Sequence, residues 1–477
     1  MMHPNVLRIG KFPADARSGQ LGLSCYVPQD VPVAKLAACE RDPDPMLSSL
    51  RYRLKRLFTH IWVPIGAYAV LGLVAAVVAV GLRGFIPASW AFNIGADAID
   101  GLLNILASSM LAVTTFSLSI MLAAFAAASS TATPRAFQLL KADRTAQQVL
   151  ASFIGAFIFS LVGIISLKIG IYGEGGRVIL FAATILVLIL IVFNLVRWIG
   201  HLTDFGRLGD TMARVEAAAA DAMSRRLDTP WLGANPMHGA HPPASAVPVK
   251  AGVVGHIQFI NLDNLNALAT EAECNIYIAV TPGTFVYRGS DLAHILNGPV
   301  GEDFETLLDQ ISGCFDIGMN RSFDQDPRFG MITLSEIASR ALSPAVNDPG
   351  TAIDVIRRMT RVLSLWQDKS EADVIYPRLF VHGLDSEDML RDAFSAMSRD
   401  GAALYEMHIA LQSALLALVQ LDHRIFAAGA LGESRRAMIY ARDAMIYGYD
   451  VERLQRIADR IADMVEVPAA DSLVTRT

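Results

Sequence analysis

Two prolines five residues apart interrupt helical sequence in the stretch 341–352, ALSPAVNDPGTA. Pro344 is expected to end the preceding helix, because proline lacks a backbone N–H and clashes with the previous turn. Asn347 or Asp348 can cap the next helix, and Pro349 is tolerated at its first position, where a missing N–H costs least. These residue types therefore predict a helix stop followed directly by a helix start.

The same break also suits a binding site. The first turn of the new helix presents free N–H groups and the positive end of the helix dipole. Ser343, Asn347 and Thr351 would surround that end of the helix. The carboxylate of Asp348 disfavours a purely anionic ligand there, so both interpretations, a cap and a ligand or interface site, stay open.

A second polar cluster precedes this break in the stretch 321–331, RSFDQDPRFGM. Asp324 and Asp326 can contribute to a divalent cation site, but such cations take six or more oxygen ligands. We expect instead that Arg321 and the two aspartates form a buried or interfacial polar network. The candidate ligand or interface site then comprises Arg321, Asp324, Asp326, Ser343, Asn347, Asp348 and Thr351.

The remaining sequence offers little for catalysis. It contains no Ser-His-Asp order, phosphate-binding loop or zinc signature. The cysteines, at 25, 39, 274 and 314, form no CxxC pair, which fits a reducing compartment. The net charge of -6 comes without the long basic tract typical of nucleic-acid binding. We expect no catalytic residues, no metal, no cofactor and no nucleic-acid partner, and an enzyme is the least supported class.

Long apolar runs dominate the N-terminal half. The chain is 53% hydrophobic and 18% charged, which is more apolar than an ordinary soluble protein. A hydrocarbon core of about 30 Å requires roughly 20 apolar residues in a helix. Four runs meet this length and predict four spans in a lipid bilayer: 61–82, 101–130, 149–172 and 178–198.

Basic residues beside these runs predict the orientation, because cytoplasmic loops are enriched in Lys and Arg. They gather before the first run, between the second and third, and after the fourth, whereas the opposite loops hold Arg83 and Arg177 among several acids. We expect a multi-pass protein of the bacterial inner membrane with both termini in the cytoplasm.

The second run carries a polar seam. Asn104, Ser108, Thr115 and Ser119 recur with alanines at three- or four-residue steps, which places them on one helix face. Small and hydroxylated residues are typical of packed membrane helices. They also suit the lining of a central pore, to which each subunit contributes one helix.

Pro134 and Arg135 follow this run. Proline ends or kinks a long helix, and an arginine there anchors the helix at the cytoplasmic surface. The alternative role for the pair is a gate hinge.

The fold class expected is a membrane α-helical protein with four transmembrane helices, followed by a cytoplasmic α+β region that is mostly a helical bundle with a small β module. The expected domains are a flexible tail (1–48), a four-span membrane domain (49–200), a helix and Pro/Gly/Ala-rich linker (201–250), the β module (251–300), the helical domain (301–466) and a C-terminal tail (467–477).

The sequence resembles a bacterial family of predicted membrane proteins, domain of unknown function number 2254. The resemblance rests on 321-RSFDQDPRFGM-331, 341-ALSPAVNDPGTA-352, 282-PGTFVYRG-289 and the Ser/Thr-rich second run that ends in 133-TPR-135. It covers the chain from about residue 49 to about residue 464 and implies the architecture and membrane location, but no activity.

Two functions follow from these patterns. The first is a homo-oligomeric channel or transport protein, lined by the second run, that conducts an ion or small solute under control of a cytoplasmic regulatory domain. The second is a membrane-anchored sensor or scaffold whose cytoplasmic domain binds a partner or small ligand. We favour the channel, because the seam and its basic cytoplasmic end suit a pore.

Overall fold

The computed structural model describes residues 96–141, 143–170, 173–237, 242–298, 301–366 and 373–466, together with Gly66, Val70 and Val74. The chain divides into two units, Met1–Asp44 and Pro45–Thr477, of which the first lies outside the described residues. The predicted span at 61–82 also lies outside them apart from the three isolated positions, so it stays a prediction.

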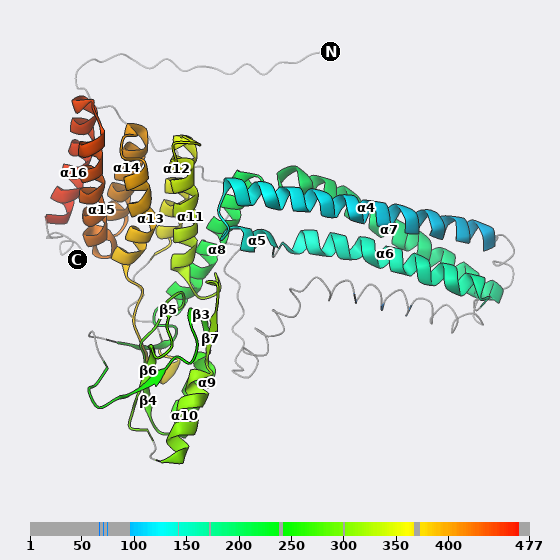
Figure 1. Cartoon of the computed structure of the whole chain (residues 1–477), viewed down its shortest axis with the longest axis horizontal. Helices are drawn as coiled ribbons and strands as arrows, with labels where there is room; N and C mark the ends of the chain where they lie inside the picture. Colours follow the sequence, from blue (N-terminus) through cyan, green and yellow to red (C-terminus); the bar gives the residue numbers. More distant parts are fainter. Residues whose placement is uncertain are drawn as a thin grey trace, which may run out of the picture. The chain divides into compact units, whose positions relative to one another are not determined.

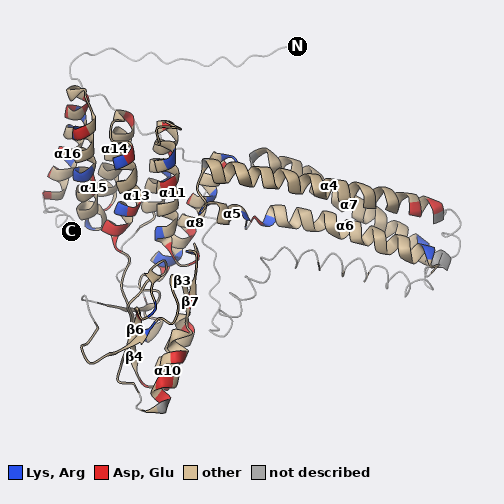
Figure 2. Ribbon diagram, viewed as in Figure 1, with Lys and Arg blue, Asp and Glu red and all other residues tan. Residues whose placement is uncertain are grey.

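Three helical segments among the described residues are long and apolar enough to cross a membrane, namely Asp97–Ser130, Phe137–Lys168 and Gly176–Thr203. They belong to α4 (Ala96–Thr131), α5 (Phe137–Lys141), α6 (Arg144–Lys168) and α7 (Gly173–Asp204). These helices correspond to the second, third and fourth runs of the sequence. Their charged residues gather near the helix ends (Figure 2), as a hydrocarbon interior requires.

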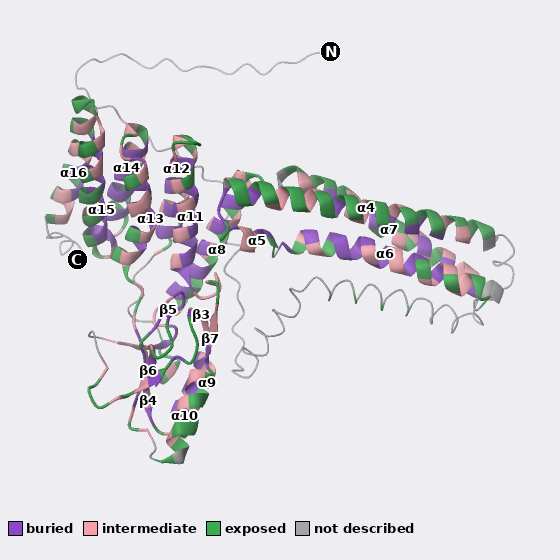
Figure 3. Ribbon diagram, viewed as in Figure 1, coloured by how far each residue is buried: buried purple, intermediate pink, exposed green. Residues whose placement is uncertain are grey.

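The three long helices are buried to different extents. Just over half of the apolar window of α6 is buried, against 11% for α4 and 17% for α7. Figure 3 shows this difference along the three ribbons. The contacts between α4 and α6 are the most extensive of the membrane part. Helix α6 is therefore the central packing element, and α4 and α7 each leave a face exposed.

The C-terminal part contains a bundle of helices around one apolar core (Figure 1). Gly448 begins the last helix. We call these helices the helical bundle: α8 (Leu208–Asp228), α11 (Pro327–Ala341), α12 (Pro349–Leu363), α13 (Ser386–Asp400), α14 (Tyr405–Leu421), α15 (His423–Ala444) and α16 (Gly448–Glu466).

A second apolar core lies between two sheets and two helices. The five-stranded sheet has the order β1-β8-β4-β6-β2, and the three-stranded sheet has the order β5-β3-β7. Strand β8 is parallel to β1 and β4, and the other pairs are antiparallel. We call this part the β module: β1 (Ala234–Pro236), β2 (Val247–Lys250), β3 (Gly255–Ile260), α9 (Leu262–Glu271), β4 (Asn275–Ile278), β5 (Phe285–Val286), β6 (Asp291–Leu296), α10 (Glu302–Ser312), β7 (Phe315–Gly318) and β8 (Tyr376–Val381).

The β module draws on more of the chain than the expected range 251–300. Strands β1 and β2 come from the expected linker, and β7 and β8 come from sequence expected to be helical. Strand β8 lies between β1 and β4 and buries Leu379 and Val381 completely. A six-residue strand takes this place through pairing with segments far away in the sequence, which local periodicity does not reveal.

Candidate functional site

The polar seam of α4 is exposed. Asn104, Ser108, Thr115 and Ser119 are all solvent-accessible in the single chain, and so are the alanines at 112, 123 and 126. At 100° per residue the four polar positions fall within an arc of about 60°. Large apolar side chains flank this arc, with Leu111 and Leu118 on one side and Ile105 and Phe116 on the other, and the exposed Leu122 falls within the arc one turn beyond Ser119. We call the arc the polar strip of α4.

The side chains of the polar strip bond to their own helix. The Asn104 amide donates to the Asp100 carbonyl at 2.8 Å, and the Ser108 hydroxyl donates to the Asn104 carbonyl at 2.9 Å. Thr115 and Ser119 donate to the carbonyls four residues earlier, at 2.9 and 3.0 Å. Each hydroxyl oxygen keeps lone pairs that can accept a further hydrogen bond, so the strip can contact a polar solute.

The opposite face of α4 makes the contacts within the chain. Leu103, Leu106 and Met110 are buried against α6 and α7. The indole nitrogen of Trp198 in α7 donates to the buried hydroxyl of Ser117 at 2.9 Å. Packing among the described membrane helices therefore uses this face, and the predicted seam is not part of it.

Pro134 and Arg135 lie where α4 meets the helical bundle. Pro134 is exposed, and the neighbouring alanines at 132 and 136 are completely buried in the bundle core. Arg135 forms an ion pair with Glu336 of α11. The guanidinium of Arg340, also in α11, lies 3.4 Å from the Ala132 carbonyl. The end of α4 is thus held by α11.

An ionic cluster that sequence reasoning missed lies nearby. Asp143 caps α6 by accepting from the Ala146 N–H at 2.8 Å. Its carboxylate also contacts Arg214 of α8 at 2.5 Å and His201 of α7 at 3.3 Å. An aspartate directly before an apolar helix is a recognisable cap. Its two other partners come from distant sequence.

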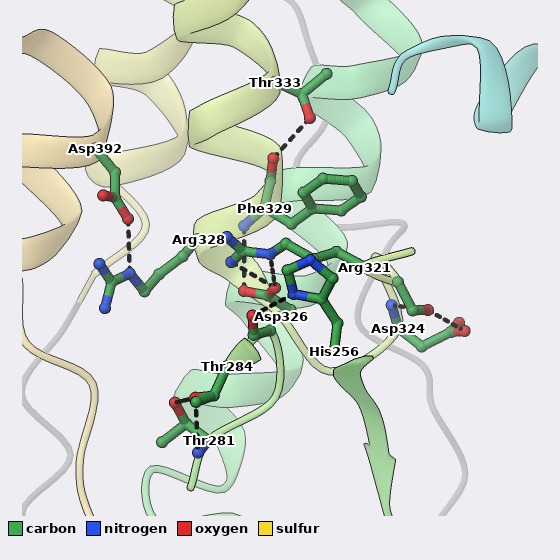
Figure 4. A network of polar contacts seen from close by, with 12 residues as sticks. His256, Thr281, Thr284, Arg321, Asp324, Asp326, Arg328, Phe329, Thr333 and Asp392 are labelled. Carbon is green, nitrogen blue, oxygen red and sulfur yellow. Dashed lines mark hydrogen bonds and ion pairs between the residues drawn. The ribbon is translucent and has the colours of Figure 1, made fainter. Parts of the chain in front are cut away.

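Arg321 and the Phe329 N–H contact one buried carboxylate of the 321–331 segment, that of Asp326 (Figure 4). Asp326 is 2% exposed and accepts from Arg321 Nε at 2.8 Å and Nη2 at 2.6 Å. It also caps α11 through the Phe329 N–H at 3.1 Å. Burial raises the pKa of Asp326, although Arg321 acts in the opposite direction.

A glycine of the β module meets this ion pair. Gly283, at φ +92°, packs so closely that a Cβ there would overlap the side chains of Asp326 and Arg321. The Gly283 carbonyl also lies 3.1 Å from His256 Nδ1. The 282-PGT-284 turn thus packs against the 321–331 segment. The close contact and the positive φ explain why the turn needs glycine at position 283.

The other polar residues of the segment have separate partners. Asp324 accepts from the Ser322 hydroxyl at 2.9 Å and does not share the Arg321 pair. Gln325 accepts from the Ile260 N–H at 2.9 Å. Arg328 forms ion pairs with Asp388 and Asp392 of α13 at 2.7 and 2.6 Å. Arg328 and Gln325 were not among the predicted residues, because their partners lie more than 50 residues away.

The other predicted cluster forms the turn between α11 and α12. Asp348 caps α12, since its carboxylate accepts from the Thr351 N–H at 3.0 Å and from the Thr351 hydroxyl at 2.6 Å. These hydrogen bonds lower the pKa of Asp348. Asn347 adopts the left-handed conformation at φ +49°, and its N–H donates to the Ser343 carbonyl at 2.9 Å.

The two predicted clusters lie at opposite ends of α11. Asp326 caps its first turn, and Ser343 follows its last. Fifteen residues at 1.5 Å each separate these ends by about 22 Å. The structure therefore brings Arg321 to Asp326 and Asp348 to Thr351, but it does not unite the seven residues in one site. Among the described residues, no group of three or more His, Cys, Asp or Glu side chains is placed to hold a metal ion.

Comparison with known proteins places these features in a family. Uncharacterized proteins of Mycobacterium bovis and Mycobacterium tuberculosis are each 27% identical to the chain over 292 residues, which are 57% of this chain and 53% of the relative. The chain thus spans about half the length of the curated relatives it matches. No solved structure matches the chain. The model of a family described as "Predicted membrane protein (DUF2254)" matches residues 59–417, and the chain belongs to this family.

Proposed function

We propose that the protein assembles into a homo-oligomer in which α4 of each subunit lines a path for an ion or small solute across the membrane. The observation that carries this proposal is the exposure of the polar strip, while α6 and α7 pack on the other face of α4. A row of polar side chains that faces lipid gains no hydrogen bonds there, whereas the same row around a central axis forms a hydrophilic lining.

The surroundings of the polar strip suit such an assembly. The leucines and aromatic residue beside it can pack against neighbouring α4 helices, and the small side chains within it allow close approach. No charged side chain lies in α4 between Asp100 and Thr131. The path would therefore contact its solute through hydroxyl and amide groups.

The attachment of α4 to α11 supports a regulatory role for the globular part. Ala132 and Ala136 are buried in the bundle core, and Glu336 and Arg340 of α11 contact the intervening segment. The other end of α11 contacts the β module through Asp326. A displacement of α11 would be transmitted to the end of α4, because buried alanines and the contacts of Glu336 and Arg340 connect the two helices directly.

The orientation that we propose places the helical bundle and the β module in the cytoplasm of a bacterial cell, at the inner membrane. Arg135, Lys141, Arg144 and Arg214 lie near the bundle end of the membrane helices, and Asp97 and Asp100 lie near the other end. Basic residues at membrane borders favour the cytoplasmic side.

A second candidate function is a membrane-anchored sensor or scaffold. Its support is the exposure of Ile105, Phe116 and Leu122 on the same helix, since large apolar side chains suit contact with lipid. In that case the hydroxyl groups, already bonded to their own helix, would face lipid or a neighbouring helix at little cost.

Flux measurements on the purified protein in liposomes separate the two functions. The probes are K⁺, Cl⁻ and glycerol. Ser108→Trp places a bulky ring in the polar strip, and Leu186→Trp places the same ring on the exposed face of α7. These positions lie at similar depth, since each falls between the Leu103–Leu180 contact and the Ser117–Trp198 contact.

We expect flux of at least one probe from the parent protein, a loss of about tenfold or more for Ser108→Trp, and a change below about twofold for Leu186→Trp. Cross-linking in the liposomes would establish the oligomer independently. Absence of flux for all probes, in a protein that still forms the oligomer, would reject the channel and leave the scaffold.

A further inference from the structure

Arg226, in the last turn of α8, is a buried cation with incomplete hydrogen bonding. Its residue exposure is 5%, and its Nη2 donates to the His382 carbonyl at 3.0 Å. The buried Nε and Nη1 have no acceptor among the described residues. Burial lowers the pKa of Arg226 to about 10. A guanidinium has five N–H donors, and leaving several of them unmet in the interior is costly.

The carboxylate near Arg226 already has other hydrogen-bond donors. Asp326 is the acid whose charge acts on Arg226. Its carboxylate accepts both hydrogen bonds from Arg321 and one from the Phe329 N–H. Arg328, whose charge also acts on Asp326, is paired with two carboxylates of its own. Arg226 and Arg321 therefore share one carboxylate, which leaves a surplus of one positive charge in a buried place.

This surplus lies where the helical bundle and the β module are connected. Arg226 precedes the connection from α8 to β1, and His382 lies in the connection from β8 to α13. Arg321 and Asp326 lie in the connection from β7 to α11 (Figure 4). Gly283 of the β module packs on their ion pair. We call Arg226, Arg321, Asp326 and the His382 carbonyl the joint.

We propose that the joint binds a small oxyanion, such as a carboxylate or phosphate group, and that Arg226 is its receptor. An oxyanion supplies both the missing negative charge and several acceptor oxygens for the Nε and Nη1 donors. Arginine suits this task because its donors match planar and tetrahedral oxyanions, while its weak hydration reduces the cost of burial.

Binding at the joint would hold three chain connections in one arrangement. Asp326 caps helix α11, which contacts the segment after α4 through Glu336. If the proposed function is correct, the oxyanion therefore regulates the path along α4. The binding itself does not depend on that function.

Thermal unfolding of the full-length protein in detergent tests the site. The protein is titrated with sodium phosphate or sodium acetate at pH 7, and sodium chloride keeps the ionic strength constant. The parent chain is compared with Arg226→Met and with Arg225→Met. Arg225 is the control, because it is the preceding residue of α8 but is exposed and pairs with Asp221, while its Nη2 donates to the backbone carbonyl of Asp324 and not to the buried carboxylate.

We expect phosphate or acetate to raise the melting temperature of the parent chain and of Arg225→Met in a saturable way, while Arg226→Met shows no such rise. In chloride alone, Arg226→Met should melt no lower than the parent, because an apolar side chain replaces an incompletely paired buried cation.

Arg226→Lys provides a second measurement if the methionine variant does not fold. Lysine keeps the charge but offers fewer donors, so the half-saturating oxyanion concentration should rise at least fivefold. The proposal is overturned if neither oxyanion stabilises the parent beyond chloride, or if the variants at 226 respond as the parent does. Flux plays no part in this readout, so the site and the channel can fail independently.

Discussion

Helices α4 and α7 both expose one face of a membrane span, but the two faces differ in chemistry. The exposed face of α7 carries large apolar side chains, among them Leu186, Ile189, Phe193 and Val196. The exposed face of α4 carries the polar strip between its apolar flanks. The mean hydropathy of the apolar window is 3.0 for α7 and 2.0 for α4.

This difference teaches that hydropathy alone assigns a span but does not assign its environment. Both hydropathy values suffice for insertion into a membrane. Helix α6, which packs against α4 and α7, uses its small residues for packing. Gly163 of α6, for example, fits directly against Leu103 of α4. Lipid contact suits the exposed face of α7, whereas the exposed face of α4 carries both hydroxyl groups and large apolar side chains, so it suits either lipid or the neighbouring α4 helix that we propose.

The largest effect should come from placing a charge on each face. Leu186→Arg would expose a guanidinium to lipid near the middle of the span, which costs about 3 kcal/mol on insertion scales. Ser108→Arg should be tolerated, because its charge would face an aqueous path. Quantitative blots of isolated membranes would measure the amount of inserted protein. Equal losses for the two variants would show that the polar strip also meets lipid.

Reaction with a water-soluble thiol reagent provides the next test. Ser108→Cys should react at least about tenfold faster than Leu186→Cys in intact liposomes, because thiolate forms in water and not in hydrocarbon. The rate for the parent chain is subtracted as the background of its own cysteines. Similar slow rates at both positions would contradict a hydrated α4 face.

A smaller effect should distinguish the two faces of α4 itself. Ser117→Ala removes the acceptor of the buried Trp198 indole and should lower the free energy of unfolding by about 1 kcal/mol. Ser119→Ala removes an exposed hydroxyl bonded to its own helix and should change it by less than about 0.5 kcal/mol. Denaturation in detergent measures both, and a larger loss at Ser119 would assign the strip to packing.

A further small change in stability, below that expected for Ser117→Ala, concerns the attachment of α4 to the bundle. Arg135→Ala breaks an ion pair in which the arginine side chain is 51% exposed, so the loss should be about 0.5 kcal/mol. Its effect on flux should be larger than this loss implies, because the pair links α4 to α11. Glu336→Ala should reduce flux as Arg135→Ala does. A normal flux in both variants would show that this ion pair does not couple α11 to α4.

Local signals in the sequence predicted local structure well. Asp348 and Pro349 occupy the start of α12 as their types require. Such features depend on neighbours within four residues. The spans at α4, α6 and α7 were predictable for a similar reason, because a continuous apolar run is sufficient evidence for each.

The residues of the joint were harder to predict from the sequence. Arg321 and Asp326 were predicted as members of a polar network, and they lie five residues apart. Arg226 is one of several arginines in α8, and nothing in its neighbourhood marks it as buried. Its contact with His382 spans 156 residues. The strands β1 and β8 escaped prediction for the same reason, since each becomes a strand through its partner.

The sequence by itself determined the membrane character of the chain, the polar strip on one face of α4, and the helix break at 341–352, because hydropathy, helical periodicity and capping act between near neighbours. The tertiary structure decided which face of α4 packs within the chain and that the two polar clusters lie at opposite ends of α11. It also decided that Arg226 is buried beside a carboxylate already in use. These outcomes depend on how distant segments fill space together, and residue types along the chain do not record that.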